Sequence, residues 1–124
     1  MAEPRRIQLS RRKGWRKPEG AVVVSRPGKW GNPFTLEWVR LDQPDITDLD
    51  ARVIAVQTFK AWLTDDAYAA PLLGSLPYRR EWILANLHTL AGKDLCCWCP
   101  LPAEGETDWC HARVLLDLAK EVTS

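Results

Sequence analysis

The sequence has no apolar run close to the about 20 residues that cross a bilayer, and no apolar segment typical of a secretion signal follows its basic start. It also contains no internal repeat and no low-complexity tract. These absences argue against a membrane-spanning, a secreted or a repetitive protein. We therefore expect a cytoplasmic protein that has no membrane partner.

Cysteine is scarce as well. The chain has four cysteines, and Cys96, Cys97 and Cys99 lie in one short segment. This number and clustering do not suit the disulfide scaffold of a small secreted domain, and the neighbours Cys96 and Cys97 do not readily bridge each other. We therefore expect reduced thiols.

The length and composition are those of one ordinary globular domain. The chain has 124 residues, of which 46% are hydrophobic and 27% charged, so global disorder is excluded. We expect a single domain over residues 1–124, with the basic segment 1–20 flexible in part.

Charge is distributed unevenly along the chain. Residues 1–30 hold nine Lys or Arg and two acids, which gives +7, whereas the other eight bases and fourteen acids give −6, in agreement with the net charge of +1. A basic segment of this kind attracts phosphate-bearing partners, either a nucleotide or a nucleic acid. Alternatively, it is a solvated surface that attracts the acidic remainder of the same chain.

The pattern of apolar residues and turn signals predicts an α/β fold. Strands are expected at 6–10, 21–26 and 94–98, and helices at 51–64, 79–91 and 111–122, with Gly92 ending the second helix. Residues 65–78 are expected to be irregular. This order favours a small single-layer sheet of three or more strands, partly parallel, packed with about three helices.

Two of these helices carry a clear apolar face. The stripe expected on helix 51–64 consists of Ala55, Val56, Phe59, Trp62 and Leu63, and the one on helix 111–122 consists of Val114, Leu115, Leu118, Ala119 and Val122. Thr47, Asp48 or Asp50 can cap the first of them, and Thr107 or Asp108 the second.

The loop RPGKWGNPF, residues 26–34, is the first candidate for a binding site. It follows a predicted strand, where ligands of open α/β sheets bind, and it combines small residues with charges and flat rings. Its candidate ligand-binding residues are Arg26, Lys29, Trp30, Gly31, Asn32 and Phe34. Such a loop can cradle a phosphate and stack a base. In the alternative interpretation, Trp30 and Phe34 fill the core and Asn32 fixes a tight turn.

The second candidate is the thiol-rich end of the chain, DLCCWCP followed by DWCHARVLL. Cys110 and His111 fall at the expected start of the last helix, where free N–H groups and the positive end of the dipole favour a thiolate. A catalytic hypothesis follows, in which Cys110 is the nucleophile and His111 the acid or base. Adjacent helical side chains diverge by about 100°, which is unfavourable for this pair.

The same segment also supports a metal hypothesis. Cys97, Cys99, Cys110 and His111 supply a Cys₃His set of the kind that binds zinc. The spacing is unusual, because zinc pairs normally have about two to four intervening residues. A third interpretation treats the strand cysteines as small buried hydrophobes, and it applies best to Cys96 or Cys97.

Arginine and tryptophan residues add weaker signals. Arg79 and Arg80 open a predicted helix, where cations are unfavourable, so they are candidates for contact with an anionic ligand. Trp15, Trp98 and Trp109 lie near basic or thiol-rich segments and are candidates for the lining of a pocket.

The motifs AVVVSRPGKWGNPF, LAGKDLCCWCPLP and CHARVLLDLA together resemble domain of unknown function family 4326, a family of small bacterial and viral proteins. The resemblance covers residues 6–118 and implies a cytosolic protein of a bacterium or of a virus in its host. It marks the KWGNPF residues, Cys99, Cys110 and His111 as typical positions of the family, and it implies no reaction. The segment AEGETDW between Pro102 and Cys110 is longer than the family pattern and can move Cys110 away from Cys99.

Two functional hypotheses follow. In the first, the loop 26–34 and the start of the last helix share a pocket for a nucleotide-like or nucleic-acid ligand, on which Cys110 and His111 act. In the second, the protein is a non-catalytic module, stabilised by zinc, that binds nucleic acid or a host protein.

Overall fold

A computed structural model describes residues 3–26, 28–65 and 76–123 of the chain. Three short strands form its sheet, namely β1 (Arg6–Gln8), β2 (Val22–Val23) and β3 (Leu95–Cys97). Its helices are α1 (Leu36–Asp42), α2 (Asp48–Thr64), α3 (Leu76–Asn86), the short 3₁₀ helix η2 (Leu87–Leu90) and α4 (His111–Thr123). None of these helices is long and apolar enough to cross a membrane.

The sheet is entirely parallel, and β3 is its central strand. The strand order is β1-β3-β2, with Ile7 and Val23 both in register with Cys96. Backbone hydrogen bonds from Leu9 to Cys97 and from Val24 to Cys96 extend both ladders beyond the strand ends. All three strands therefore end at the same edge of the sheet, which is where ligands bind in open α/β folds.

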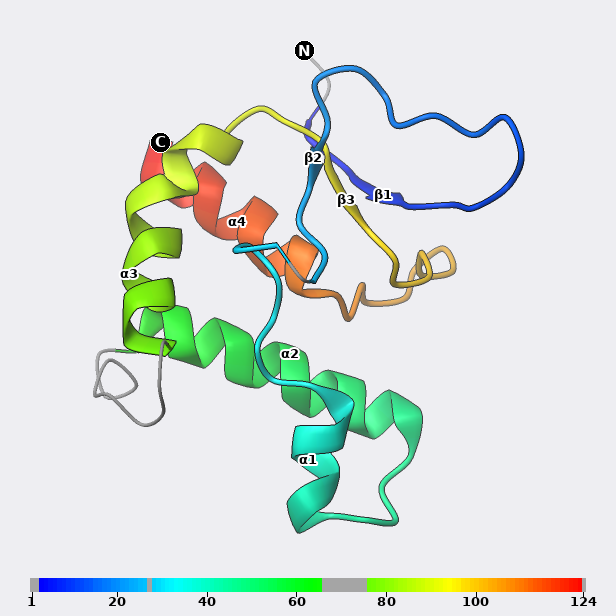
Figure 1. Ribbon diagram of the computed structural model, residues 1–124, viewed down its shortest axis with the longest axis vertical. Coiled ribbons are helices and arrows are strands. Elements are labelled where there is room, and N and C mark those ends of the chain that lie inside the picture. The colour runs from blue at the N-terminus through cyan, green and yellow to red at the C-terminus, as the bar shows by residue number, and fades with distance from the viewer. Residues whose placement is uncertain (1–2, 27, 66–75, 124) are drawn as a thin grey trace.

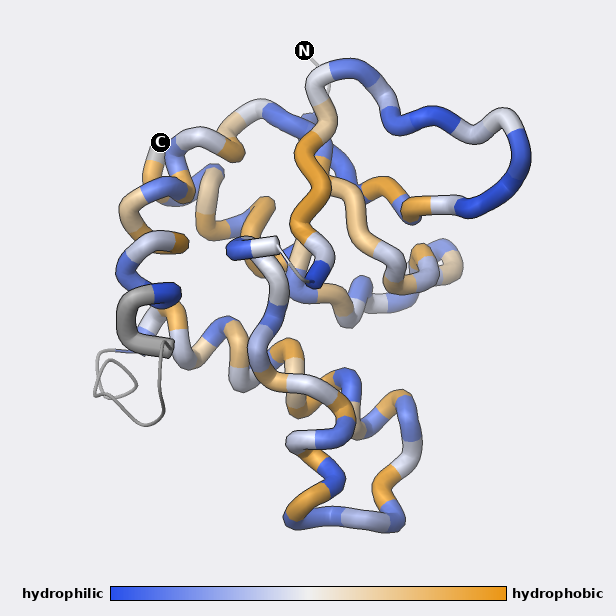
Figure 2. The backbone as a smooth tube through the Cα atoms, viewed as in Figure 1, coloured by the Kyte–Doolittle hydropathy of each residue, from blue (hydrophilic) through white to orange (hydrophobic). Residues whose placement is uncertain are grey.

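Helices cover the sheet and enclose the main core. Helix α4 packs against β1, β3, η2 and α2, while α1 packs on the end of α2 that lies away from α3 (Figure 1). The largest fully buried side chains of this core include Phe59, Ile83, Leu87, Leu95 and Leu115. Apolar residues alternate with hydrophilic ones along the helices, as Figure 2 shows.

The α/β class, the parallel strands and the helix of residues 51–64 are confirmed. All five residues of the expected stripe on α2 are buried. Helix α2 begins at Asp48, and the Thr47 side chain caps it by accepting a hydrogen bond from the backbone N–H of Asp50. The strands are shorter than predicted, because only three residues of β1 and two of β2 pair in register with β3.

Several predicted boundaries were wrong. Helix α1 was not predicted, so the described residues contain four α-helices. The helix expected at 79–91 begins earlier, at Leu76, and its last turn is the separate 3₁₀ helix η2. The segment 65–78 was expected to be irregular, and its residues 66–75 lie outside the described residues.

The last helix begins at His111 as predicted, but it differs from expectation in the residue before its first turn and in the exposure of its last turn. Its first residue is His111, so the residue directly before the helix is Cys110. The predicted capping residues Thr107 and Asp108 lie further from the helix start. At the other end, Val122 is 55% exposed, because the final turn of α4 extends beyond the core. The position of Cys110 outside the helix has consequences for the thiol cluster.

Candidate metal centre

The carboxyl ends of β2 and β3 and the start of α4 bring the thiol-rich segments together. Cys97 is the last residue of β3, Cys99 follows it by two residues, and Cys110 and His111 stand at the entry to α4. Because side chains alternate along a strand, Cys96 points to the opposite face, where it is fully buried with Leu9 and Ala21. Cys96 is thus a buried hydrophobe, whereas its neighbour Cys97 belongs to the cluster.

Three sulfur atoms converge at this point. The Sγ atoms of Cys97, Cys99 and Cys110 lie within 4.8 Å of one another, and those of Cys97 and Cys99 are 3.8 Å apart. In a tetrahedral site with Zn–S bonds of about 2.3 Å and Zn–N bonds of about 2.1 Å, two sulfurs lie about 3.8 Å apart and a sulfur lies about 3.6 Å from nitrogen. The thiols therefore have nearly the spacing that zinc requires.

His111 presents one ring nitrogen to the same sulfurs. Its Nδ1 lies 3.9 Å from the Sγ atoms of both Cys97 and Cys110. Its Nε2 lies 2.7 Å from the carbonyl oxygen of Val24, and a carbonyl only accepts, so Nε2 carries the proton and donates it. In the neutral ring, Nδ1 then keeps its lone pair. The perpendicular ring of Phe59, with centroids 5.5 Å apart, further fixes the imidazole.

The proton distribution among the thiols is uneven. Hydrogen bonds with Cys110 and Cys99 hold the pKa of Cys97 well below its ordinary value. Hydrogen bonding to Cys97 and Cys99, together with burial, raises the pKa of Cys110 well above the ordinary range. The three thiols therefore differ in how readily they lose a proton, and a divalent cation that binds them would displace those protons.

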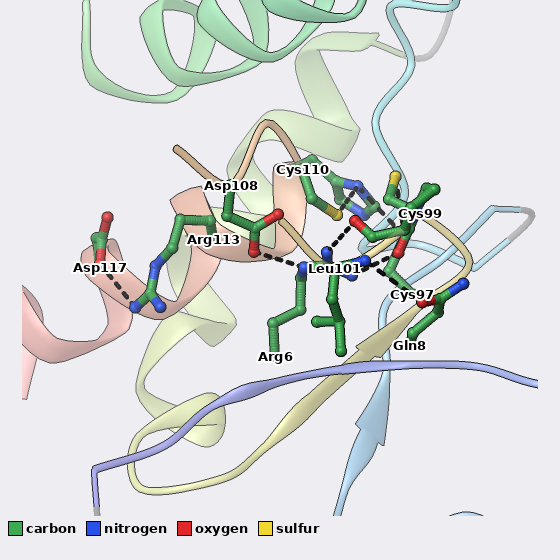
Figure 3. Close-up of polar contacts among 11 residues, drawn as sticks. Arg6, Gln8, Cys97, Cys99, Leu101, Asp108, Cys110, Arg113 and Asp117 are labelled. Carbon is green, nitrogen blue, oxygen red and sulfur yellow. Dashed lines mark hydrogen bonds and ion pairs between the residues drawn. The ribbon is translucent and has the colours of Figure 1, made fainter. Parts of the chain in front are cut away.

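Arg6 ties together the two ends of the loop that carries the cluster (Figure 3). Its Nε donates to Asp108 Oδ2 at 2.5 Å, and its other nitrogens donate to the carbonyls of Cys99 and Pro100 at 2.8 and 2.6 Å. The Arg6 side chain is buried, with 1% exposure, and the Asp108 side chain is largely shielded, with 12% exposure. Burial alone would lower the pKa of Arg6. The hydrogen bond to Asp108 and the nearby negative groups together outweigh burial, so the pKa of Arg6 is raised.

Two differences from expectation follow from the clamp of Arg6 with Asp108 and from the helix start at His111. The longer segment between Pro102 and Cys110 does not separate Cys110 from Cys99, because Arg6 holds both ends of it. The divergence of adjacent helical side chains does not apply either, since Cys110 lies before the first helical residue. Cys110 and His111 can therefore point to one place.

A cavity of about 410 Å³ opens beside the cluster, a size typical of ligand pockets. Cys97, Cys99 and His111 form part of its wall, and Cys110 does not line it. The aromatic residues Trp98 and Trp109 also line it. The structure therefore brings the predicted binding loop and the thiol-rich end to one pocket.

Only some of the predicted ligand-binding residues of the loop 26–34 line the cavity. Arg26, Asn32 and Phe34 line the cavity. Trp30 instead packs edge-on against Trp82, with ring centroids 4.8 Å apart.

The remaining glycine and lysine of that loop have local roles. Gly31 is buried, and a Cβ there would lie 2.7 Å from Cγ of Arg26 and 3.0 Å from its backbone, so only glycine fits. Lys29 places its ammonium group 5.1 Å from the centre of the Trp82 ring. Neither residue lines the cavity.

Arg79 and Arg80 are both engaged by backbone carbonyls. Arg79 donates to the carbonyls of Gly28, Lys29 and Gly31 and so holds the loop. The buried Arg80 donates through Nε to the carbonyl of Trp62 at 2.5 Å. Neither arginine lines the cavity.

Three functional residues were missed by the sequence analysis. Arg6 and Asp108 form the clamp, and Arg52 of α2 lines the cavity. Arg6 is one of nine cations in the first 30 residues, so no local signal distinguishes it. Arg52 lies in a helix three residues before Ala55, so a helical projection places it beside the predicted stripe, but the sequence does not show that the thiol-rich end faces it.

No curated protein and no solved structure matches this chain. The profile of one family, described as Domain of unknown function (DUF4326), matches residues 7–121. This range includes the loop 26–34 and all four residues of the thiol and imidazole cluster. The chain therefore belongs to the DUF4326 family, as its KWGNPF and Cys-His motifs indicated.

Proposed function

We propose that this protein is a zinc-binding module in which Cys97, Cys99, Cys110 and His111 hold one Zn²⁺ ion, and that the cavity beside the ion takes a nucleotide-like or nucleic-acid ligand. The observation that carries the proposal is the convergence of three sulfurs at spacings close to those of a tetrahedral zinc site, with the imidazole nitrogen of His111 3.9 Å from two of them. A set of thiolate and imidazole ligands in this geometry suits zinc best.

The surroundings of the four ligands support a metal site. His111 donates its second ring N–H to the carbonyl of Val24, which is the usual way in which a protein orients a metal-binding imidazole. Three thiolates and one neutral imidazole around Zn²⁺ carry a net charge of −1. The buried Arg6 and the amino end of α4 both lie beside the cluster and offset that charge.

The zinc ion would have a structural role. Its ligands come from the end of the central strand, the residues just after it and the start of the last helix, so the ion would fasten that helix start to the strand end across the intervening loop. A site with four protein ligands leaves no open position for a reacting water. Ion binding would then contribute directly to folding free energy.

The nucleophile hypothesis for Cys110 has less support than the ligand role. Cys110 is fully buried, does not line the cavity, and has a pKa raised well above the ordinary range. A reactive thiol needs the opposite conditions, namely access and a lowered pKa.

The cavity supports an anionic ligand with a flat ring. Arg26 and Arg52 line it together with three aromatic residues, and its described lining contains no carboxylate. Guanidinium groups bind phosphate, and the aromatic faces can stack on a base.

Zinc content tests the proposal, and two adjacent cysteines provide a matched pair of variants. Cys96 and Cys97 are both buried on β3 but face opposite sides. We expect one zinc per chain in the native protein and in Cys96→Ala, and close to none in Cys97→Ala. If zinc-reconstituted native protein held no metal and all its thiols reacted freely, the proposal would be wrong.

A further inference from the structure

The loop between β1 and β2 displays cations that have no acidic partner within the described chain. Arg11, Arg12, Lys13 and Arg16 are exposed, and no ion pair joins any of them to a described residue. Arg5 pairs instead with Asp94, and Arg6 with Asp108. The acidic remainder of the chain thus neutralises the start of the basic segment and leaves the loop charged.

This loop has a defined path. Trp15 packs on Leu9, Ala21 and Cys96, and its backbone N–H donates to the carbonyl of Arg12 across a turn. The Lys17 ammonium group donates to the carbonyl of Ala21 at 2.5 Å. Figure 1 shows the loop projecting from the sheet away from the helices, and Figure 2 shows its strongly hydrophilic character.

Trp98 connects the basic loop to the cavity. The guanidinium carbon of Arg11 lies 4.6 Å from the centre of the Trp98 ring. Trp98 is 43% exposed and also lines the cavity beside the thiol cluster. Cations and aromatic faces therefore follow one another from the loop into the cavity.

Inside the cavity, the positive charge is also not compensated. The Arg52 side chain forms no hydrogen bond or ion pair with a described residue, and the Arg26 side chain bonds only the carbonyl of Asn32, at 3.3 Å. Outside the cavity wall, burial lowers the pKa of Arg79 and the nearby charge of Arg26 lowers it further. An anion bound in the cavity would compensate the charges of Arg26 and Arg52.

We propose that this surface binds single-stranded nucleic acid, with backbone phosphates along Arg12, Lys13 and Arg16, one base stacked on Trp98, and the next nucleotide in the cavity beside Arg52. This inference rests on the proposed function, because it names the ligand class of the same cavity. Stacking platforms alternating with basic side chains are the usual means by which proteins hold unpaired strands. A duplex keeps its base faces inside its own stack and cannot use Trp98 in this way.

The test measures binding of zinc-loaded full-length protein to a fluorescently labelled single-stranded oligonucleotide, in DNA and RNA forms, by anisotropy at several salt concentrations. We expect Trp98→Ala to lose roughly 10-fold or more in affinity, since base stacking on an aromatic ring contributes that order of effect. Arg12→Glu should weaken binding and reduce the salt slope by about 0.7 for each phosphate that the protein no longer neutralises. Lys60→Glu, an exposed charge reversal on α2 outside the cavity lining, should leave the affinity nearly unchanged.

Three results with variants or competing polymers would overturn the inference. The first is unchanged affinity in both Trp98→Ala and Arg52→Gln, and the second is tighter binding of duplex than of single strand. The third is equal competition by polyglutamate of the same charge. That result would show that the surface binds polyanions or acidic proteins without recognising bases. A free mononucleotide that binds as tightly as the oligonucleotide would likewise exclude a single strand as the ligand of this surface. Zinc content is measured on every sample, so a zinc-loaded protein that fails to bind the strand refutes this inference and leaves the metal site intact.

Discussion

The loop of residues 26–34 and the thiol cluster border the same cavity, yet they differ in what their polar groups contact. In the loop, other parts of the chain bond most of these groups. Arg79 holds three of its carbonyls, and both ends of the Asn32 amide are bonded, to Ala55 and Phe34. In the cluster, the sulfurs and the free imidazole nitrogen face mainly one another.

This difference shows that a motif can be rich in special residue types for two distinct reasons, namely loop structure and ligand binding. The KWGNPF segment needs its residue types because a tight loop must turn closely at Gly31 and close against α2 and α3, as the bonds from Asn32 to Ala55 and from Arg79 to Gly31 show. The Cys and His residues contribute little that ordinary small hydrophobes could not provide for packing alone. Their convergence is better explained by a ligand that they share, which is the basis of the proposed zinc site.

The largest expected effect is that of removing the metal. A ligand present at about 1,000 times its Kd stabilises the folded state by about 4 kcal/mol, so a strong chelator should lower the unfolding free energy of the native protein by at least that amount. Urea unfolding with and without chelator measures this change. Cys97→Ala should show no chelator effect, and an equal chelator effect in that variant would contradict the assigned ligands.

Breaking the Arg6 clamp should be the next largest change. Removing one partner of a buried ion pair costs about 3–5 kcal/mol, so we expect Arg6→Ala to lose this stability and part of its zinc affinity. The adjacent Arg5 is a matched control, because its pair with Asp94 is exposed and such pairs contribute about 0–1 kcal/mol. Similar losses in both variants would show that the clamp has no special role.

The loop should respond to changes at Asn32 as a structural element. In Asn32→Ala, the carbonyl of Ala55 and the N–H of Phe34 lose their partners, which should cost about 1–3 kcal/mol. Zinc content should stay at one per chain. If stability were unchanged and ligand binding lost, Asn32 would be a binding residue and the contrast between the two regions would disappear.

The smallest effect is expected at Lys29. Its ammonium group is exposed and contacts the Trp82 ring, an interaction that contributes about 0.5–1 kcal/mol. Lys29→Ala should therefore change stability little, and oligonucleotide affinity less than Arg52→Gln does. Anisotropy on the two variants side by side measures this, and a greater loss at Lys29 would restore its predicted role as a phosphate contact.

Local patterns predicted the elements whose cause is local. The stripe on α2 and the apolar run of β3 are both where periodicity and turn signals indicate. Helix α1 has only seven residues, too few for a period to be recognised. Pro77 suggested a break in the chain, yet it lies in the first turn of α3, where proline is tolerated.

The candidate site was predicted in its composition but not in its arrangement. The four ligands could be named from residue types, although their spacing differs from that of ordinary zinc motifs. They converge because a strand end and a helix start meet, and because Arg6 bonds Asp108, which is 102 residues away in the chain. Such a long-range pairing depends on the sheet order, which one sequence does not reveal.

Substitution of cobalt for zinc tests the central claim most directly, because the visible spectrum of Co²⁺ reports both geometry and sulfur coordination. We expect one cobalt per chain, with the intense visible bands of a tetrahedral site and sulfur-to-cobalt charge transfer. These bands should be retained in Cys96→Ala and lost or strongly altered in Cys99→Ala and His111→Ala. A weak spectrum typical of octahedral cobalt, identical in native protein and all three variants, would contradict the proposed metal centre.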